Sequence, residues 1–283
     1  MATQLGSIPI TLGNLQLAVA DDSGVDWVVT DVKGWDSPGL RAESATRQAD
    51  HGAWPAPVYL DARPITITGS IEAPTQEARD AAVDELTAAV ALTDTLLVVE
   101  ETTPKQVVVR RSGQLLIQLE GLYNATYSAM VTAYDPRRYS TTLQTQSTGL
   151  PSVSGGLTIP VSLPISLTSS ITGGAFTLIN DGSIDTRPVF TISGPAVNPI
   201  VVCTHPDGST DQLTYSATLV LGDQLVIDTD AHTVTLNGTV SRRRYLSGTW
   251  PEIGPSSSLA VQWSATAYDA AALLTGTCRS AWM

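Results

Sequence analysis

The sequence contains few charged residues and almost no cysteine. Cys203 and Cys278 are the two cysteines of a 283-residue chain, and their separation excludes a disulfide framework and a zinc site of the usual CxxC spacing. We expect both to be buried thiols. Only 15% of the residues are charged, and 27 acidic against 15 basic residues give a formal net charge of -12. Nucleic-acid binding is therefore disfavoured, because the chain would repel a phosphate backbone.

Long apolar runs are also missing. No stretch reaches the ~18 uncharged apolar residues that a membrane span needs, and the amino terminus has neither a basic segment nor a continuous apolar one. We expect a protein made in a cytoplasm, with no membrane insertion. The 42% of hydrophobic residues, with 22 Gly and 17 Pro, are typical of a globular chain of short strands and turns. The length favours two domains.

The first half of the sequence predicts strands and one helix. Alternating residues predict a hairpin of 8–12 with 15–19, and a strand over 63–71 with a bulge at Gly69. Apolar residues recur at helical spacing from Gln76 to about Leu92, after the start signal at Pro74 and Thr75. Residues 33–57 form a long loop, which we interpret as a functional segment or an arm that packs on a neighbour. Further strands are predicted over 25–32, 95–99, 106–111, 114–119 and 125–134, with a two-residue hairpin turn at Ser112 and Gly113.

The second half predicts an all-β domain. Residues 146–156 are rich in Thr, Ser, Gln and Gly and indicate a linker, which gives domains at 1–145 and 157–283. After the linker, short alternating runs separated by turn residues favour a β-sandwich or jelly roll. These runs are 158–167, 175–180, 188–193, 200–204, 212–219, 224–228, 233–237 and 258–265. The fold class is therefore mainly β, with one helix in the first domain.

Catalytic motifs are missing as well. The histidines His51, His205 and His232 are scattered, and no hydrolase, metalloprotease or nucleotide-binding motif occurs. The adjacent Glu100 and Glu101 would point to opposite faces of a strand and make a poor acid and base pair. We therefore expect no enzyme and no cofactor.

The segment DTDAH is the best candidate for a metal site. Asp228, Asp230 and His232 would place oxygen and nitrogen donors at alternate positions of an extended strand. A strand that ends in a polar turn accounts for the same residues, because Asp side chains cap turns. We adopt the turn and predict no metal.

Aromatic and arginine residues supply the candidate contact sites. Both an interface role and core packing fit the two tryptophans of the 33–57 loop, while the three consecutive arginines of the second half could bind phosphate, bind a partner's carboxylates or form a solvated face. The candidate interface residues are Trp35, Trp54, Arg137 and Arg138, and the candidate ligand or partner residues of the second domain are Arg242, Arg243, Arg244, Tyr245 and Trp250.

The order of turns in the second half resembles the carboxy-terminal domain of siphophage distal tail proteins. The similarity rests on a turn at Asn180 to Gly182, a Pro-led strand at Pro188, turns at Gly222–Asp223 and Asn237–Gly238, the strand residues Ile227 to Thr229, and Trp250–Pro251. In the first half, DARPITITGSI and AYDPRRYS are similar to the amino-terminal ring domain of the same family. The sequence departs from the family at Ser256 to Ser258, where relatives tend to have Gly and Asn.

This resemblance implies a structural virion protein of the tail tip, assembled in the host cytoplasm. Its first domain would form a ring, usually a hexamer, and its second would be an outward galectin-like sandwich. The implied partners are copies of itself, the major tail tube protein, the tail hub or tail-associated lysin-like protein, the tape measure protein and a receptor-binding protein. Genomic DNA would pass through the lumen without specific binding, which an acidic wall permits. The alternative is a carbohydrate-binding module that adheres to the host cell wall, with Tyr245 and Trp250 as sugar contacts.

Overall fold

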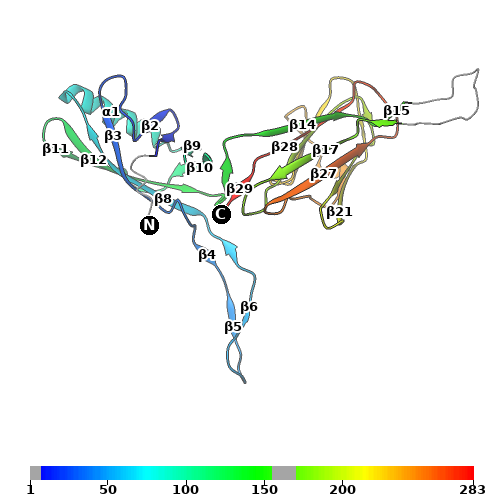
Figure 1. Cartoon of the computed structure of the whole chain (residues 1–283), viewed down its shortest axis with the longest axis horizontal. Helices are drawn as coiled ribbons and strands as arrows, with labels where there is room; N and C mark the ends of the chain where they lie inside the picture. Colours follow the sequence, from blue (N-terminus) through cyan, green and yellow to red (C-terminus); the bar gives the residue numbers. More distant parts are fainter. Residues whose placement is uncertain (1–7, 155–169) are drawn as a thin grey trace, which may run out of the picture. The chain divides into compact units, whose positions relative to one another are not determined.

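The computed structural model describes residues 8–154 and 170–283 and divides the chain into two units. Unit 1 ends at Thr141 and includes the last two residues, Trp282 and Met283, whereas unit 2 runs from Thr142 to Ala281. The described residues contain one α-helix, and nearly all other regular elements are antiparallel strands (Figure 1). The predicted fold class is thereby confirmed. The strand predicted over 158–167 lies outside the described residues.

Unit 1 is built on one antiparallel sheet. Along the sheet the strand order is β2-β1-β9-β10-β12-β8-β3, with β11 beside β12 and β13 beside β10. These strands are β1 (Ile10–Leu12), β2 (Leu15–Leu17), β3 (Asp26–Lys33), β8 (Arg63–Glu72), β9 (Thr95–Val99), β10 (Lys105–Arg111), β11 (Leu116–Glu120), β12 (Asn124–Ala133) and β13 (Arg138–Ser140). The short strand β29 (Ala281–Trp282) ends the chain. The hairpin of β1 with β2 is confirmed.

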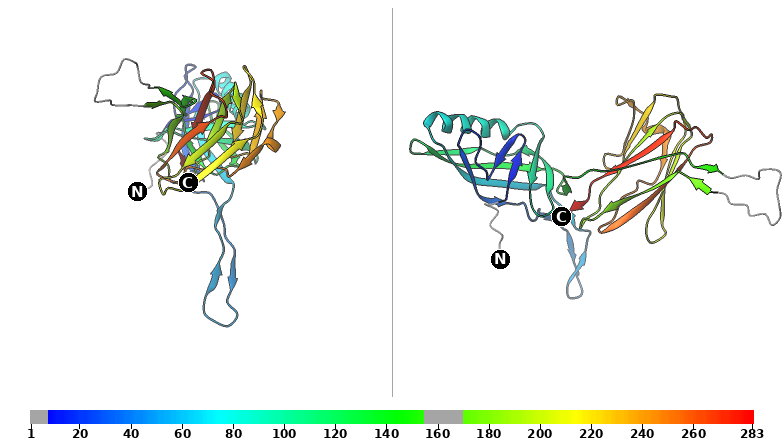
Figure 2. Two further views of the ribbon diagram at one scale, coloured as in Figure 1. Left: turned by 90° about the vertical axis from the view of Figure 1, so that its right-hand side faces the viewer. Right: turned by 45° about the horizontal axis from the view of Figure 1, so that its top comes forward.

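The predicted helix is α1 (Gln76–Ala89). Thr75 caps it, because its hydroxyl accepts the backbone N–H of Ala78 at 3.2 Å, which satisfies one of the free donors of the first turn. Ala82 and Leu86, from the predicted apolar stripe, are buried in the core of unit 1. Figure 2 shows the helix lying across one face of the sheet.

Gly69 allows a close approach between β8 and β3. A Cβ at this position would lie 2.0 Å from the carbonyl oxygen of Val28, so a larger residue would push the two strands apart. The irregularity predicted at Gly69 is found in the partner strand, where the β3 register shifts between Val29 and Asp31. The extra residue therefore belongs to β3, although the glycine that accommodates it belongs to β8.

The two-residue hairpin predicted at Ser112 and Gly113 is wrong. In the described pairings both β10 and β11 lie along β12 and not along each other. The Ser112 N–H donates to the carbonyl oxygen of Met130, and the Met130 side chain lies against Gly113. The chain thus continues along β12. Alternation in the sequence does not predict this, because it shows on which face of the sheet a side chain lies but not which strand lies beside it.

The segment predicted as a long loop is a two-stranded arm. In it β4 (Leu40–Arg41) pairs with β7 (Tyr59–Leu60), and β5 (Ser44–Thr46) pairs with β6 (Ala53–Pro55). Figures 1 and 2 show this arm extending away from the sheet of unit 1. We define the arm as residues 39–60, a segment in which no residue is buried.

Unit 2 is a sandwich of two antiparallel sheets, in the orders β14-β28-β18-β23-β24-β25 and β17-β27-β20-β21-β26. The first sheet comprises β14 (Gln144–Gly149), β28 (Leu273–Cys278), β18 (Val189–Ser193), β23 (Gln224–Asp228), β24 (Thr233–Leu236) and β25 (Val240–Ser241). The second comprises β17 (Ala175–Asn180), β27 (Ser257–Ser264), β20 (Ile200–Thr204), β21 (Thr210–Tyr215) and β26 (Leu246–Gly248). Two further pairs join β15 (Ser152–Ser154) to β16 (Ser170–Thr172) and β19 (Ala196–Val197) to β22 (Thr218–Leu219). A short 3-10 helix, η2 (Arg243–Tyr245), precedes β26.

The core of unit 2 lies between the two sheets. Phe190 and Leu274 from one sheet and Val201 and Leu259 from the other are at most 1% exposed. Gln144 of β14 joins the sheet edges, because its side-chain amide donates to the Ile179 carbonyl oxygen at 2.6 Å and accepts the Ile179 N–H at 3.0 Å. A side chain thus supplies the pair of hydrogen bonds that a neighbouring strand would make. The expectation of buried thiols is confirmed, since Cys203 and Cys278 are free and buried.

Two strands of unit 2 differ from the sequence prediction. Residues 146–149, placed in the predicted linker, belong to β14, which pairs with β28 along its whole length. The polar composition of β14 reflects its position at a sheet edge. The sequence pattern does not predict β28, because its internal glycine is typical of a break. Gly276 is instead a packing position, where a Cβ would lie 2.6 Å from the ring of Phe176.

Candidate functional site

A partly buried polar cluster lies at the base of the arm. The Glu101 carboxylate accepts hydrogen bonds from the Trp35 indole and from the Lys105 ammonium, and the Arg138 guanidinium lies 3.9 Å from it. Burial alone would raise the pKa of Glu101, but the hydrogen bonds from Lys105 and Trp35 and the charges of Lys105 and Arg138 lower it below the ordinary 4.5. The charged Glu101 carboxylate therefore connects the β9–β10 turn to Trp35, which lies four residues before the arm.

Trp35 has a packing role within unit 1. Its side chain is 0% exposed, so within this chain it offers no surface to a partner. The buried Arg63 donates to the carbonyl oxygens of Trp35, Gly34 and Pro136, the last at 2.9 Å. Burial, together with the charge of Arg138, lowers the pKa of Arg63 to about 10. These contacts fix the direction in which the chain leaves the sheet to form the arm.

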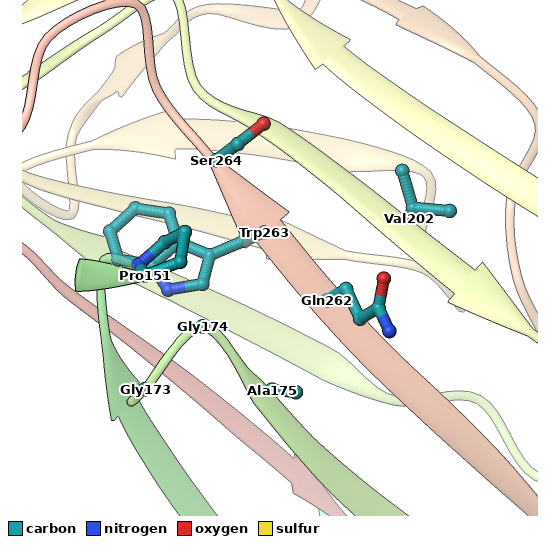
Figure 3. Close-up of a pocket in the computed structure, with 8 residues that line it drawn as sticks. All are labelled: Pro151, Gly173, Gly174, Ala175, Val202, Gln262, Trp263 and Ser264. Carbon is teal, nitrogen blue, oxygen red and sulfur yellow. The ribbon is translucent and has the colours of Figure 1, made fainter. Parts of the chain in front are cut away.

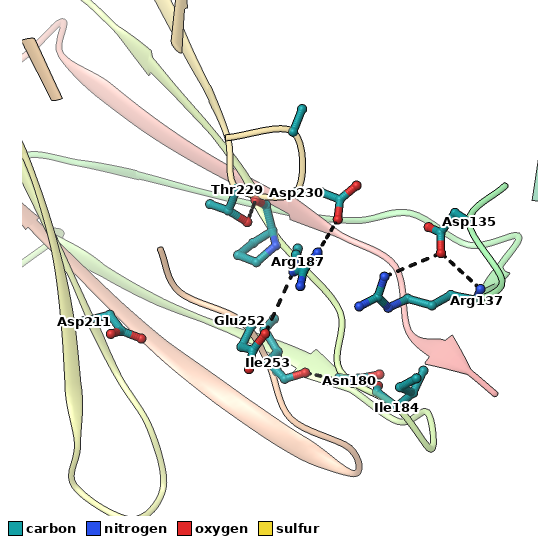
Figure 4. A network of polar contacts seen from close by, with 12 residues as sticks. Asp135, Arg137, Asn180, Ile184, Arg187, Asp211, Thr229, Asp230, Glu252 and Ile253 are labelled. Carbon is teal, nitrogen blue, oxygen red and sulfur yellow. Dashed lines mark hydrogen bonds and ion pairs between the residues drawn. The ribbon is translucent and has the colours of Figure 1, made fainter. Parts of the chain in front are cut away.

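Arg137 and Arg138 are also held within unit 1. The Arg138 guanidinium donates to the carbonyl oxygen of Met283 at 3.0 Å and lies 5.3 Å from the centre of the Trp35 ring. Arg137 contacts the carboxylate of Asp135 through both its backbone N–H and its guanidinium (Figure 4). The predicted interface residues Trp35, Arg137 and Arg138 thus already have partners inside unit 1.

The arm carries exposed apolar side chains. Trp54 is 62% exposed, and the guanidinium of Arg47 lies 4.3 Å from its ring centre. We call the four large apolar residues of the arm the arm surface, namely Leu40, Trp54, Val58 and Tyr59, whose exposed fractions lie between 58% and 62%. Sequence reasoning identified Trp54 alone, because the segment lacks the alternation that would reveal a ribbon. Exposed apolar side chains grouped in one segment are a common feature of interaction sites.

The DTDAH segment forms a turn. The Asp228 carboxylate accepts the backbone N–H groups of Asp230 and Ala231, both at 2.9 Å, which is how an Asp side chain caps a turn. Asp230 forms an ion pair with Arg187 at 2.8 Å (Figure 4). His232 has a left-handed φ of 53° and stacks on Trp250. The three donors thus have three different contacts, and within the described ranges no group of three His, Cys, Asp or Glu residues could hold a metal ion.

The candidate contact residues of unit 2 gather around η2. The rings of His232 and Trp250 stack with centres 4.6 Å apart and planes 17° apart, and Arg243 lies 4.9 Å from the Trp250 ring centre. Arg244 and Arg242 lie 4.7 and 5.5 Å from the ring centre of Tyr245. We call this surface the arginine ledge, which comprises His232, Arg242, Arg243, Arg244, Tyr245 and Trp250. Sequence reasoning missed only His232, since 18 positions separate it from the tryptophan on which it stacks.

A buried asparagine holds several backbone segments of unit 2 together. Asn180 is 0% exposed, and its amide donates to the carbonyl oxygens of Ile184, Ile253 and Gly254 at 2.7 to 3.1 Å (Figure 4). Its side-chain oxygen accepts the N–H groups of Gly182 and Ala281. Asn180 therefore satisfies five backbone groups, and its role here is structural. The turn signal in the sequence identified the position but not this bonding.

A cavity of about 380 Å³ opens on unit 2 (Figure 3). Its lining residues are Pro151, Gly173, Gly174, Ala175, Val202, Gln262, Trp263 and Ser264. None of these residues titrates, so the cavity offers hydrogen bonds and apolar contacts but no acid or base chemistry. The indole N–H of Trp263 is already donated to the carbonyl oxygen of Gly149 at 2.9 Å.

The remaining histidines lie apart from this cavity. His205 pairs with Asp211 at 2.8 Å in the β20–β21 hairpin, and His51 is exposed in the arm.

Among the described residues, no helix is both long and apolar enough to cross a membrane.

Part of unit 2 matches a known family model. Residues 181–270 match the family model of the siphovirus-type tail component, C-terminal domain. The resemblance predicted from the order of turns is thereby confirmed, and the predicted location in the virion tail agrees with it.

The whole chain has the fold of one particular solved structure, the SPP1 Dit (gp 19.1) protein. The two share a TM-score of 0.65 and 11% sequence identity over 98% of this chain and 99% of that chain. That structure is described as a paradigm of hub adsorption apparatus in Gram-positive infecting phages. A chain of the phage p2 baseplate in its activated conformation also matches, with a TM-score of 0.47 and 11% identity over 93% of this chain and 99% of that chain. No curated protein matches the chain by sequence.

Proposed function

We propose that the chain is a structural subunit of the distal tail of a long-tailed phage, and that its copies close into a ring, of six by the family resemblance, at the tail tip. The observation that carries this proposal is the arm. A two-stranded ribbon is at best marginally stable alone in water, and the arm has no buried side chain of its own. Its exposed apolar residues therefore favour binding to a partner outside the chain.

A second copy of the chain is the partner that we infer for the arm surface. A closed ring needs two different complementary surfaces on each subunit, one of which the arm provides. The β11–β12 hairpin offers a candidate acceptor, because four of its large apolar residues are more than half exposed, namely Leu116, Leu119, Leu122 and Tyr123. Full burial of a large apolar side chain contributes roughly 1.5 to 3 kcal/mol, so four such residues supply a substantial part of an association free energy.

The ring would join the tail tube to the tip and would not catalyse a reaction. Its inferred neighbours are the major tail tube protein, the hub or tail-associated lysin-like protein, the tape measure protein and a receptor-binding protein. The net charge of -12 supports a lumen through which genomic DNA passes without binding, since like charges repel.

Removing the arm surface tests the ring. We expect W54A combined with Y59A to lower the oligomer fraction of the purified chain in light scattering and negative-stain images. The circular dichroism of the protein should not change, because both side chains are exposed. Leu92→Ala is the matched control, since Leu92 is an exposed apolar residue of unit 1 outside the arm. A wild-type chain that remained monomeric at high concentration would contradict the proposal.

The carbohydrate-binding alternative has less support. Sugar rings bind to free aromatic faces, whereas the Trp250 ring contacts His232 and Arg243 and the Tyr245 ring contacts Arg242 and Arg244.

A further inference from the structure

The arginine ledge concentrates positive charge on an acidic protein. Unit 2 contains five arginines and no lysine, and three of the arginines are the consecutive residues of the ledge. Arg187, in contrast, pairs with Asp230 and lies 3.9 Å from Glu252. Among the described residues, no carboxylate lies within 4 Å of the guanidinium groups of Arg242, Arg243 or Arg244. The pKa of Asp223 is lowered mainly by hydrogen bonds from Asn237 and Val220, with a smaller contribution from the charge of Arg242. The ledge is therefore not neutralised within its own unit.

The three guanidinium groups are held in place by uncharged neighbours. Arg243 donates to the carbonyl oxygen of Leu246 at 2.9 Å, and Arg244 donates to the Tyr245 hydroxyl at 2.7 Å. Tyr245 in turn packs edge-on against Tyr215, which is 2% exposed. The ledge is thus anchored to the core of the sandwich, and its side chains lose little conformational entropy when they bind a ligand.

Most hydrogen-bond donors of the ledge remain unused. A guanidinium carries five N–H donors, yet within the part of the chain that the structure describes Arg243 and Arg244 use one each. The side chain of Arg242 uses none, and its Nε is buried without a partner. The unused N–H donors and the unpaired positive charges of the ledge together favour an anion that presents several acceptor oxygens.

We propose that the arginine ledge binds a ligand that carries several phosphate groups and that it recognises the phosphates themselves. Planar guanidinium groups match phosphate oxygens in bidentate geometry, and three adjacent cations are balanced better by multivalent phosphate than by a single carboxylate. The aromatic rings of the ledge already contact arginine and histidine side chains, so they serve to position cations and not to stack sugars or bases. This inference does not depend on ring formation.

Titration of the full-length chain with sodium tripolyphosphate at low salt tests the ledge. We expect calorimetric binding that weakens as the salt concentration rises, because screening reduces exposed electrostatic contacts. R243Q and R244Q should each weaken binding roughly tenfold, the loss expected for one charge-assisted contact. Both residues are exposed, and unchanged thermal melting of either variant will show that the fold is intact.

R110Q in unit 1 is the matched control. Arg110 is also an exposed arginine near an aromatic ring, Tyr134, but it forms an ion pair with Asp94, so R110Q should bind as the wild type does. Parallel titrations with poly-glutamate and with oligothymidylate of equal charge identify the ligand class. Tighter binding of poly-glutamate would assign the ledge to an acidic protein, and tighter binding of oligothymidylate would show that the ledge recognises nucleosides and not the phosphates themselves. Either result, the lack of tripolyphosphate binding, or equal losses in R243Q and R110Q would overturn the proposal.

Discussion

Replacing Glu101 with glutamine removes the charge at the centre of the cluster that holds the base of the arm. The Glu101 side chain is 23% exposed and contacts the Lys105 ammonium, the Trp35 indole and the Arg138 guanidinium. Glutamine keeps an acceptor for Trp35 but loses the charge that strengthens the contacts with Lys105 and Arg138. Hydrogen bonds to charged groups contribute roughly 1.5 to 3 kcal/mol, whereas an ion pair near the surface adds between about 0 and 1 kcal/mol. We therefore expect E101Q to lower the free energy of unfolding by about 2 kcal/mol at pH 7.

The same substitution has a pH dependence whose sign follows from the lowered pKa of Glu101. A carboxylate with a lower pKa in the folded state than in the unfolded state stabilises the fold above its unfolded pKa of 4.5, and this stabilisation is lost as the pH falls through the folded pKa. The difference between wild type and E101Q should thus be full at pH 7 and should shrink below about pH 4.5.

Urea denaturation followed by circular dichroism, at pH 7 and at several values below pH 4.5, measures both effects. The matched control is Glu100→Gln, which removes the same charge from the exposed neighbouring residue. E100Q should change the free energy of unfolding by less than about 0.5 kcal/mol. Equal effects of E100Q and E101Q at pH 7, or a wild-type advantage over E101Q that persists unchanged in acid, would refute this account of the cluster.

Two further predictions concern unit 2. Asn180→Ala removes a side chain that bonds five backbone groups, of which the Ile253 carbonyl oxygen keeps the Thr186 N–H as a partner. We expect a loss of roughly 3 kcal/mol in thermal or urea unfolding, and a loss below about 1 kcal/mol would show that water replaces the amide. Burial raises the pKa of Cys203 to about 12 and that of Cys278 to about 11, so at pH 8 neither thiol should react with a disulfide reagent until the protein unfolds. Rapid labelling of the folded chain would contradict this.

The strands that the sequence predicted best have alternation and turn residues at both ends. β9, β17, β20 and β23 begin and end at the predicted residues. In these segments side-chain alternation defines the two faces, and Gly, Asn or Asp marks where the chain reverses. The helix was equally clear, because Thr75 caps it and its apolar residues share one face.

The sequence predictions fail where contacts with residues distant in the sequence determine the structure. The chain after Ser112 follows β12 because of its contacts with Met130, which is distant in sequence. The Glu101 cluster depends on Trp35, 66 positions away, so two adjacent glutamates gave no sign of it. The arginine ledge was easier to predict, because five of its six members lie within nine consecutive residues.

The arm surface and the arginine ledge, which we assign to partners, share one physical property. Each carries side chains that the fold leaves exposed to solvent or without an oppositely charged neighbour. Five of the six tryptophans are buried or half-buried, whereas Trp54 is 62% exposed on a ribbon without a core. Arg79, Arg110 and Arg187 each lie beside a carboxylate, whereas the three arginines of the ledge are held only by rings and by uncharged oxygen atoms. Apolar exposure and unpaired cations are both unfavourable for an isolated chain, and scattered instances would need no explanation. The arm carries four exposed apolar side chains on a ribbon without a core, and the ledge carries three adjacent arginines, so we assign an apolar protein surface to the arm and a multivalent anion to the ledge.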